Sequence, residues 1–170
     1  GVFVISAITG STTEAGGTAT FTVNLKSQPS ANVSIAISSS DTTEGTVSPS
    51  SIMFSSSSWS TAQTVTVTGV DDTAVDGNQG YTIILGVASS SDSNYSGLDP
   101  ADVSVSNTDD DAAGITINSP GDNTTESGGS FTFTAKLNSQ PSSDVTIAIS
   151  SSDSSEGAID SSSLTFTSSN

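Results

Sequence analysis

The chain contains the stretch Thr64-Val65-Thr66-Val67-Thr68-Gly69-Val70-Asp71-Asp72-Thr73-Ala74-Val75-Asp76-Gly77. In its first part valine alternates with threonine, which is the period-two pattern of a β-strand that buries one face and exposes the other. In its second part three aspartates and a glycine follow the strand. This stretch therefore predicts a strand that ends in an acidic loop.

Similar alternating runs occur along roughly the first 110 residues. The predicted strands lie at 2–8, 18–25, 33–38, 52–54 after a short piece near 46–47, 64–70, 81–87 and 103–106. Glycine, proline and aspartate turns separate them, and no segment has helical periodicity. This succession of short strands is typical of an immunoglobulin-like sandwich. We therefore expect an all-β fold.

The charge of the chain limits its partners. Among 170 residues the formal net charge is −16, and Lys26 and Lys136 are the basic side chains. Such a surface repels nucleic acid and anionic membranes and attracts cations. No apolar stretch approaches the roughly 20 residues that a membrane span needs. We expect neither a nucleic-acid partner nor a membrane span.

The residue types also limit the chemistry. The chain has no Cys and no His, which excludes disulfides, thiol nucleophiles, the usual zinc sites and the commonest general base. A glycosidase-like carboxylate pair would need a cleft with aromatic sugar platforms, yet aromatic residues make up 5% of the chain. We therefore expect no enzymatic activity. Stability must come from core packing or from metal binding through oxygen ligands.

The chain repeats itself after 112 residues. Glu14-Ala-Gly-Gly returns as Glu126-Ser-Gly-Gly, and Val33-Ser-Ile-Ala-Ile returns as Val145-Thr-Ile-Ala-Ile. When 14–58 is aligned with 126–170, 26 of 45 positions are identical, which is far beyond shared composition. The sequence therefore predicts tandem repeats of one sandwich.

The repeat predicts the domain organisation. We expect a complete sandwich at 1–111, a short linker at 112–113, and the first half of a second repeat at 114–170. Half a sandwich exposes an apolar face and an unpaired strand edge. The second repeat should therefore be completed either by further chain or by strands of a neighbouring molecule.

Most acids of the first repeat fall at one end of the predicted sandwich. If each strand crosses it once, the end where the chain leaves toward the second repeat collects Glu14, Asp41, Glu44, Asp71, Asp72, Asp76, Asp109, Asp110 and Asp111. We call this end the exit pole. Each close carboxylate pair costs about 1–4 kcal/mol between water-like and surface-like dielectric, and a divalent cation reverses that sign. Calcium takes about six to eight oxygen ligands with tolerant geometry. The pattern therefore predicts a calcium-binding site at the exit pole.

The order of these acids resembles the Calx-beta domain and its relatives in bacterial surface proteins. In that family, equivalent positions bind a small cluster of calcium ions at the tip that faces the next domain. The resemblance covers the whole first repeat and the first half of the second. It departs at Asp76, where Glu is usual, and at Gln79, where an acid is usual, which implies fewer ions. The residues it implies as calcium ligands are Glu14, Asp41, Asp71, Asp72, Asp76, Asp109, Asp110, Asp111, Glu126 and Asp153.

Two functions follow from this interpretation. The resemblance implies a structural repeat of an adhesin stalk or surface fibre at the bacterial cell surface, rigidified by calcium at the junction between repeats. The alternative is a self-assembling filament subunit, whose half repeat is completed by strands of an adjacent molecule. Other copies of the repeat are the expected partners in both cases, and a surface receptor or glycan stays open. For any single Asp, local turn capping is an equally good explanation.

Overall fold

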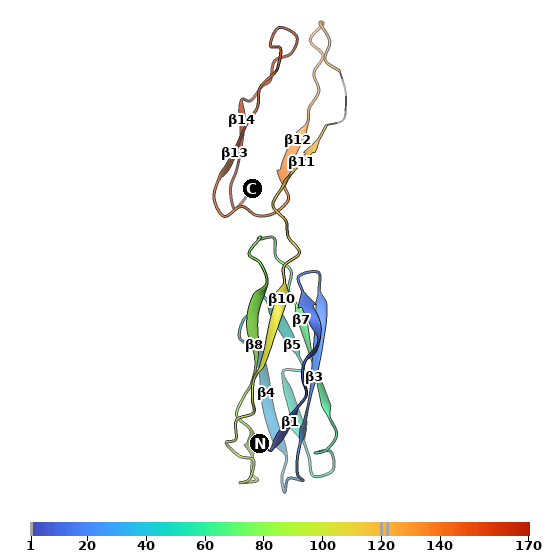
Figure 1. Ribbon diagram of the computed structural model, residues 1–170, viewed down its shortest axis with the longest axis vertical. Helices are drawn as coiled ribbons and strands as arrows, with labels where there is room; N and C mark the ends of the chain where they lie inside the picture. The colour runs from blue at the N-terminus through green and yellow to red at the C-terminus, as the bar shows by residue number, and fades with distance from the viewer. Residues whose placement is uncertain (1, 120, 122) are drawn as a thin grey trace. The chain divides into compact units, whose positions relative to one another are not determined.

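The computed structural model describes residues 2–119, 121 and 123–170. The described chain is all-β, with curled sheets consistent with a β-sandwich and no helix. No helix in the described residues has the length and hydropathy of a membrane span. The chain divides into two compact units (Figure 1). Unit 1 comprises Gly1–Asp72 and Asp76–Asp110, and unit 2 comprises Thr73–Val75 and Asp111–Asn170.

The described part of unit 1 contains ten strands. They are β1 (Phe3–Ile5), β2 (Thr9–Thr13), β3 (Gly17–Leu25), β4 (Val33–Ser39), β5 (Gly45–Ser48), β6 (Ser51–Phe54), β7 (Gln63–Gly69), β8 (Gln79–Leu85), β9 (Ser89–Ser90) and β10 (Val103–Thr108). Most of them coincide with the alternating runs of the sequence, because alternation records which side chains face the core.

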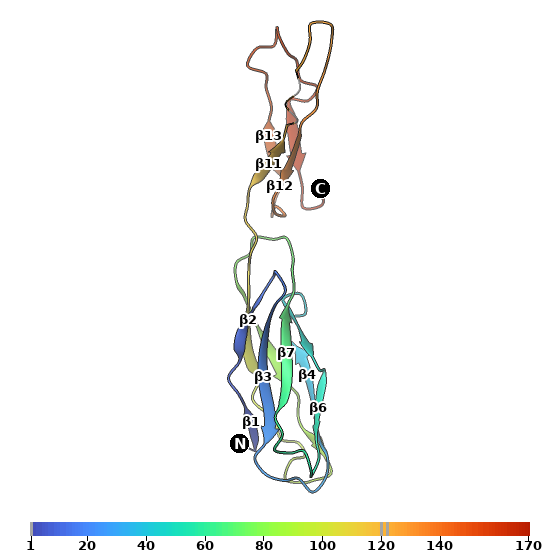
Figure 2. The same cartoon turned by 90° about the vertical axis from the view of Figure 1, so that its right-hand side faces the viewer.

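The strands of unit 1 form two layers. One layer has the order β5-β7-β3, with β1 also on β3, and the other has the order β10-β8-β4-β6, with β9 also on β4. Strand β2 joins the layers, because it pairs antiparallel with β3 and parallel with β10. Figure 2 shows β3 and β7 side by side in one layer. Hydrogen bonding is therefore continuous from one layer to the other.

The prediction of one strand at 2–8 is wrong. The structure has β1 and β2 separated by residues 6–8, with β1 on β3 alone and β2 between the two layers. A change of partner needs a break in the strand, and a β-bulge follows in β2. Gly10 has φ +89°, and an added Cβ would lie 2.7 Å from the Thr18 carbonyl oxygen. Glycine is therefore required at this bend.

The core lies between the two layers of unit 1. Strands β3 and β7 bury every second side chain, and the threonines between them are half-buried or exposed. Strands β4 and β8 also bury every second side chain, from the opposite layer. The fully buried apolar residues include Phe21, Val23, Leu25, Val33, Ile35, Phe54, Val65, Val67, Ile83 and Leu85.

A hydrogen-bonded clasp closes the end opposite the exit pole. The Tyr95 hydroxyl donates to the Ser27 carbonyl oxygen, and its ring packs edge-on against Phe3 at a centroid distance of 6.3 Å. The Asp92 carboxylate accepts a 2.7 Å hydrogen bond from the Ser30 backbone N–H. This bond, and a second one from the Asn94 backbone N–H, lower the pKa of Asp92. The clasp ties the long loop after β9 to the turn between β3 and β4.

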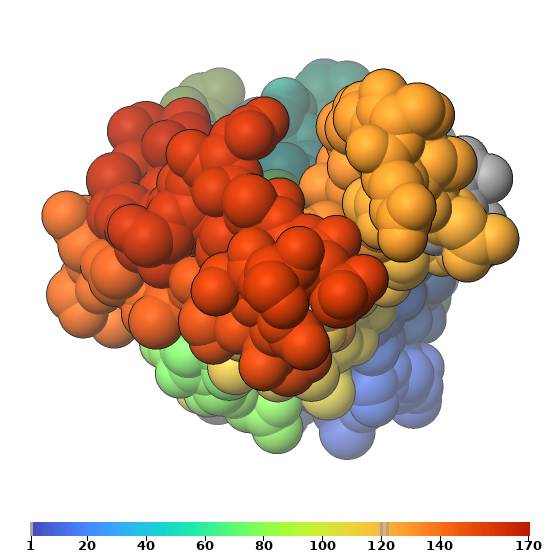
Figure 3. Space-filling view, turned by 90° about the horizontal axis from the view of Figure 1, so that it is seen from above, coloured from blue at the N-terminus to red at the C-terminus, as the bar shows by residue number. Residues whose placement is uncertain are grey.

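Unit 2 consists of two separate hairpins. Strand β11 (Ile115–Asn118) pairs with β12 (Thr134–Leu137), and β13 (Val145–Ala148) pairs with β14 (Ser163–Phe166). Figure 3 shows light-orange residues of the first hairpin and red-orange residues of the second as distinct masses with a hollow between them. None of the described residues of unit 2 is buried.

Candidate metal centre

Four loops carry the exit-pole acids, and hydrogen bonds of the backbone hold these loops together. Glu14 follows β2, and its N–H donates to the Thr108 carbonyl oxygen at the end of β10. The Val70 N–H donates to the Glu44 carbonyl oxygen. The Gly77 N–H donates to Asp109 Oδ2 at 2.7 Å. The loops after β2, β4, β7 and β10 therefore meet at one end of the sandwich.

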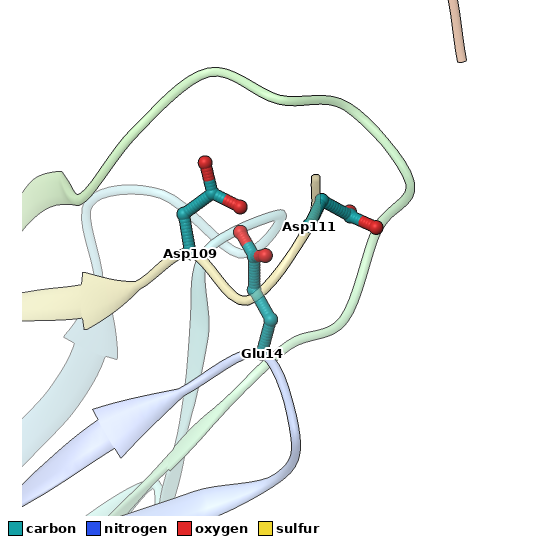
Figure 4. A group of neighbouring side chains, drawn as sticks. All are labelled: Glu14, Asp109 and Asp111. Atoms are coloured by element: carbon teal, nitrogen blue, oxygen red, sulfur yellow. The ribbon is translucent and has the colours of Figure 1, made fainter. Parts of the chain in front are cut away.

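The first acidic group consists of Glu14, Asp109 and Asp111, which we call the Glu14 group. One oxygen of each lies within 4.8 Å of the others. Figure 4 shows the Glu14 carboxylate directed between the two aspartates, which flank the turn that leaves β10. Glu14 is only 2% exposed, and its Oε2 accepts a 3.3 Å bond from the Asp110 N–H.

Burial raises the pKa of Glu14. The Asp110 N–H works in the opposite direction, and the charges of Asp109, Asp72 and Asp76 raise the pKa further. A carboxylate in this position is costly to ionise, because it is desolvated and faces like charges. The group could therefore hold a cation.

The second acidic group consists of Glu44, Asp72 and Asp76, which we call the Glu44 group. Their oxygens also lie within 4.8 Å of one another. Glu44 is 8% exposed, and both aspartates are exposed. Burial is the main cause that raises the pKa of Glu44. The Asn107 side chain lowers it, and the neighbouring acids raise it again.

Asn107 forms hydrogen bonds next to the Glu44 group. It is fully buried on β10, and its Nδ2 donates to the Val70 carbonyl oxygen at 3.0 Å and to Glu44 Oε2 at 3.4 Å. Its Oδ1 has no hydrogen-bond partner. An added Cβ at Gly69 would overlap both this Oδ1 and the Thr13 carbonyl oxygen. Glycine at position 69 therefore lets β10 and β2 approach β7 under the acids.

The structure brings together five of the ten residues predicted as ligands. Glu14, Asp109 and Asp111 meet in one group, and Asp72 and Asp76 meet in the other. Asp71 and Asp110 belong to neither group, although the Asp110 backbone N–H donates to Glu14 Oε2. Gln79, where the resembling family has an acid, donates through Nε2 to the Asp76 carbonyl oxygen at 3.0 Å.

Of the other three predicted ligands, two form hydrogen bonds within their own turns and one is exposed. Asp41 Oδ1 accepts from the Thr43 N–H at 3.0 Å and from its hydroxyl at 2.6 Å, and these bonds lower the pKa of Asp41. Asp153 makes the same two bonds with Ser155, which lower its pKa as well. Glu126 is exposed, and neither it nor Asp153 joins an acidic group among the described residues.

Two residues of the site were not among the predicted ligands. Glu44 falls at the exit pole in the sequence analysis, and its recurrence as Glu156, again before glycine, could have marked it. Asn107 could not be recognised as a site residue from the sequence, because an asparagine at the end of a strand is common in ordinary turns.

Comparisons with known proteins do not place the chain in a family. No family model matches it, and no curated protein matches it. Among solved structures, it is similar to one titled "Structure of WR4, a C.elegans MSP family member". The identity is 11% and the TM-score is 0.42, over 64% of this chain and 97% of that chain. A likeness at this level carries no inference about function.

Proposed function

We propose that the chain is an immunoglobulin-like repeat of the Calx-beta type in a bacterial adhesin stalk or surface fibre, whose exit-pole acids bind calcium. The observation that carries the proposal is the burial of Glu14 and Glu44 among like charges. No basic side chain of the described part of unit 1 compensates them, because Lys26, its one basic residue, follows the far end of β3. The acids therefore have a strong electrostatic reason to bind a cation.

The donor set fits calcium. Each group offers three carboxylates, whose oxygens are ligands of hard cations. The acids come from several loops, and calcium accepts such irregular oxygen sets more readily than octahedral magnesium. The two groups would hold the ion or ions, with Glu14 and Glu44 as the buried ligands and Asp72, Asp76, Asp109 and Asp111 around them.

The location of the acids suggests how calcium would act. Asp109 and Asp111 lie on the segment by which the chain leaves β10, whereas Glu14 lies in the turn before β3. A cation held by both would fix the exit segment to unit 1. Removing the cation restores the repulsion and frees that segment. In a chain of such repeats, this is a calcium-dependent stiffening of each junction.

The test is thermal unfolding of the full chain with millimolar calcium and with chelator. The tryptophan and both tyrosines lie in unit 1, so intrinsic fluorescence reports on unit 1 alone. Calcium at about 10–100 times its dissociation constant should add roughly 1.4–2.7 kcal/mol, which raises Tm by several degrees.

Asp71 and Asp72 provide a matched pair of variants. Asp72→Asn should reduce the calcium shift, because Asp72 belongs to the Glu44 group, whereas Asp71→Asn removes the same charge from outside both groups. Absence of any calcium shift in the parent chain, or equal losses in both variants, would contradict the proposal.

A second function is favoured by unit 2. Its exposed apolar side chains include Phe131, Phe133 and Ile159, and a partner strand would cover them. The chain would then be a filament subunit that strands of an adjacent molecule complete. Light scattering across a range of protein concentrations tests this candidate, since a filament subunit grows in mass and a stalk repeat stays monomeric.

A further inference from the structure

Asn107 is a buried amide side chain next to the Glu44 group. Among the described residues it is the one buried asparagine or glutamine. Its Nδ2 donates to the Val70 carbonyl oxygen at 3.0 Å and to Glu44 Oε2 at 3.4 Å, but its Oδ1 accepts no hydrogen bond. Buried polar atoms of native proteins nearly always have a partner. The unpaired Oδ1 therefore needs a physical explanation.

Turning the amide over does not supply a donor. A half-turn about the last side-chain bond exchanges Oδ1 with Nδ2. An added Cβ at Gly69 would overlap both Oδ1 and the Thr13 carbonyl oxygen, so these two oxygens are neighbours. The turned Nδ2 would face the Thr13 carbonyl oxygen, which has a lone pair for a further bond. The turned Oδ1, however, would face the Val70 carbonyl oxygen and the Glu44 carboxylate, which offer no hydrogen. Each orientation thus leaves Oδ1 without a donor.

A cation removes this conflict. With the amide turned over, three oxygens would converge, one each from Asn107, Val70 and Glu44. The atom that now occupies the amide corner lies 3.0 Å and 3.4 Å from the other two oxygens. Oxygens bound to one calcium ion at about 2.3–2.6 Å can adopt such separations, and amide and backbone carbonyls are both calcium ligands. The Asp72 and Asp76 carboxylates lie beside Glu44 in the same group.

We propose that Asn107 is a calcium ligand through Oδ1, and that its amide turns over when the cation binds. Nδ2 then leaves Val70 and Glu44 and donates to the Thr13 carbonyl oxygen. The inference rests on the proposed calcium binding and adds a neutral ligand from β10 to the acids of the loops. Because Asp109 follows two residues later, this ligand would join the Glu44 group to the strand by which the chain leaves unit 1.

The first test is NMR of the isotope-labelled full chain, with chelator and with calcium chloride. Scalar couplings across hydrogen bonds should join Asn107 Nδ2 to the Val70 carbonyl carbon in chelator and to the Thr13 carbonyl carbon in calcium. The Asn107 Cγ resonance should shift as well. Asn24 is the internal control, because it is half-buried near the far end of β3, and its Cγ resonance should stay in place.

Two substitutions distinguish a ligand from a mere support. Asn107→Asp and Asn107→Leu both remove the Nδ2 donor, but only the aspartate keeps an oxygen. Asn107→Asp should bind calcium at least as tightly as the parent chain. Asn107→Leu should raise the calcium dissociation constant about tenfold or more, and Asn24→Leu should leave it unchanged. Isothermal titration calorimetry measures all three. Equal weakening by aspartate and leucine would overturn the inference, because Asn107 would then act through Nδ2 alone.

Failure of this inference differs from failure of the proposed function. If calcium raises the Tm of the parent chain while the couplings and Cγ resonance of Asn107 stay unchanged, the calcium site stands and Asn107 is not its ligand. If calcium changes neither the Tm nor the NMR spectrum, the site and its ligand are both rejected. The NMR comparison uses the parent chain, so it decides the case even where a variant does not fold.

Discussion

Residues 14–58 of unit 1 and 126–170 of unit 2 have closely similar sequences, yet the buried residues that the structure describes all lie in unit 1. Phe21 and Phe133 occupy the same position of the repeat, and one is buried while the other is exposed. Glu14 and Glu126 differ in the same way. In unit 1 the core and the acidic site both depend on strands β7, β8 and β10, whereas the described residues of unit 2 correspond to its earlier strands. Burial is therefore a property of the assembled sandwich, whatever the pattern of its first half.

Local structure, in contrast, is the same in both units. Thr13 Oγ1 accepts from the Gly17 N–H at 3.1 Å, and Thr125 Oγ1 accepts from the Gly129 N–H at 2.9 Å. The Asp41 and Asp153 turns have matching bond lengths. Turns close through contacts within a few residues, so they form without distant partners. The two units thus separate local from long-range stabilisation.

The largest expected difference between the units concerns phenylalanine. Phe21→Ala should destabilise unit 1 by about 3–5 kcal/mol, because it leaves a cavity in a packed core. Phe133→Ala should leave the unfolding transition reported by Trp59 unchanged. Denaturant titration of both variants measures the contrast. A small effect of Phe21→Ala would show that unit 1 is not packed as described.

The next prediction concerns pH in the presence of chelator. Burial raises the pKa of Glu14 and Glu44 above the ordinary value of 4.5, so folded unit 1 binds protons more tightly than the unfolded chain. The contribution of these two groups to the stability of unit 1 should be greatest below pH 4.5. It should fall as pH rises through their raised pKa values. Glu14→Gln with Glu44→Gln should flatten this dependence in Tm measurements.

Other groups act in the opposite direction at lower pH. The pKa of Asp92 and of Asp41 is lowered, so their contribution is present above 3.8 and is lost as pH falls through their folded values. The chelated chain should therefore have a stability maximum at acidic pH, and calcium should remove the decline above it. Stability that rises steadily to pH 7 with chelator would contradict the assignment of Glu14 and Glu44.

The smallest expected effect tests the likeness of the turns. Asp41→Ala and Asp153→Ala each remove the acceptor of two bonds from the residue two positions later. Amide exchange should accelerate at Thr43 and Ser155 to a similar degree, with little change elsewhere. Heteronuclear NMR measures both amides directly. A much larger effect in one unit would mean that its turn depends on distant contacts.

The sequence predicted most strands because period two is a local record of burial. It could not predict the break at residues 6–8, since a change of strand partner depends on where β3 and β10 lie. Within the site, it placed the acids in loops but could not separate Asp71 from Asp72. Which of these neighbours joins the Glu44 group depends on the path of the loop after β7. Calcium and the surface function remain predictions for the experiments above.

The parallel pairing of β2 with β10 determines how unit 1 resists a pulling force. Asn107 lies opposite Thr12, and Thr108 lies opposite Thr13. Tension applied through the two ends of the unit draws β2 and β10 in opposite directions along their shared axis. Their hydrogen bonds must then break together in shear, which resists force better than peeling them apart singly. Unit 1 should therefore resist tension between its two ends better than a sandwich whose terminal strands peel apart.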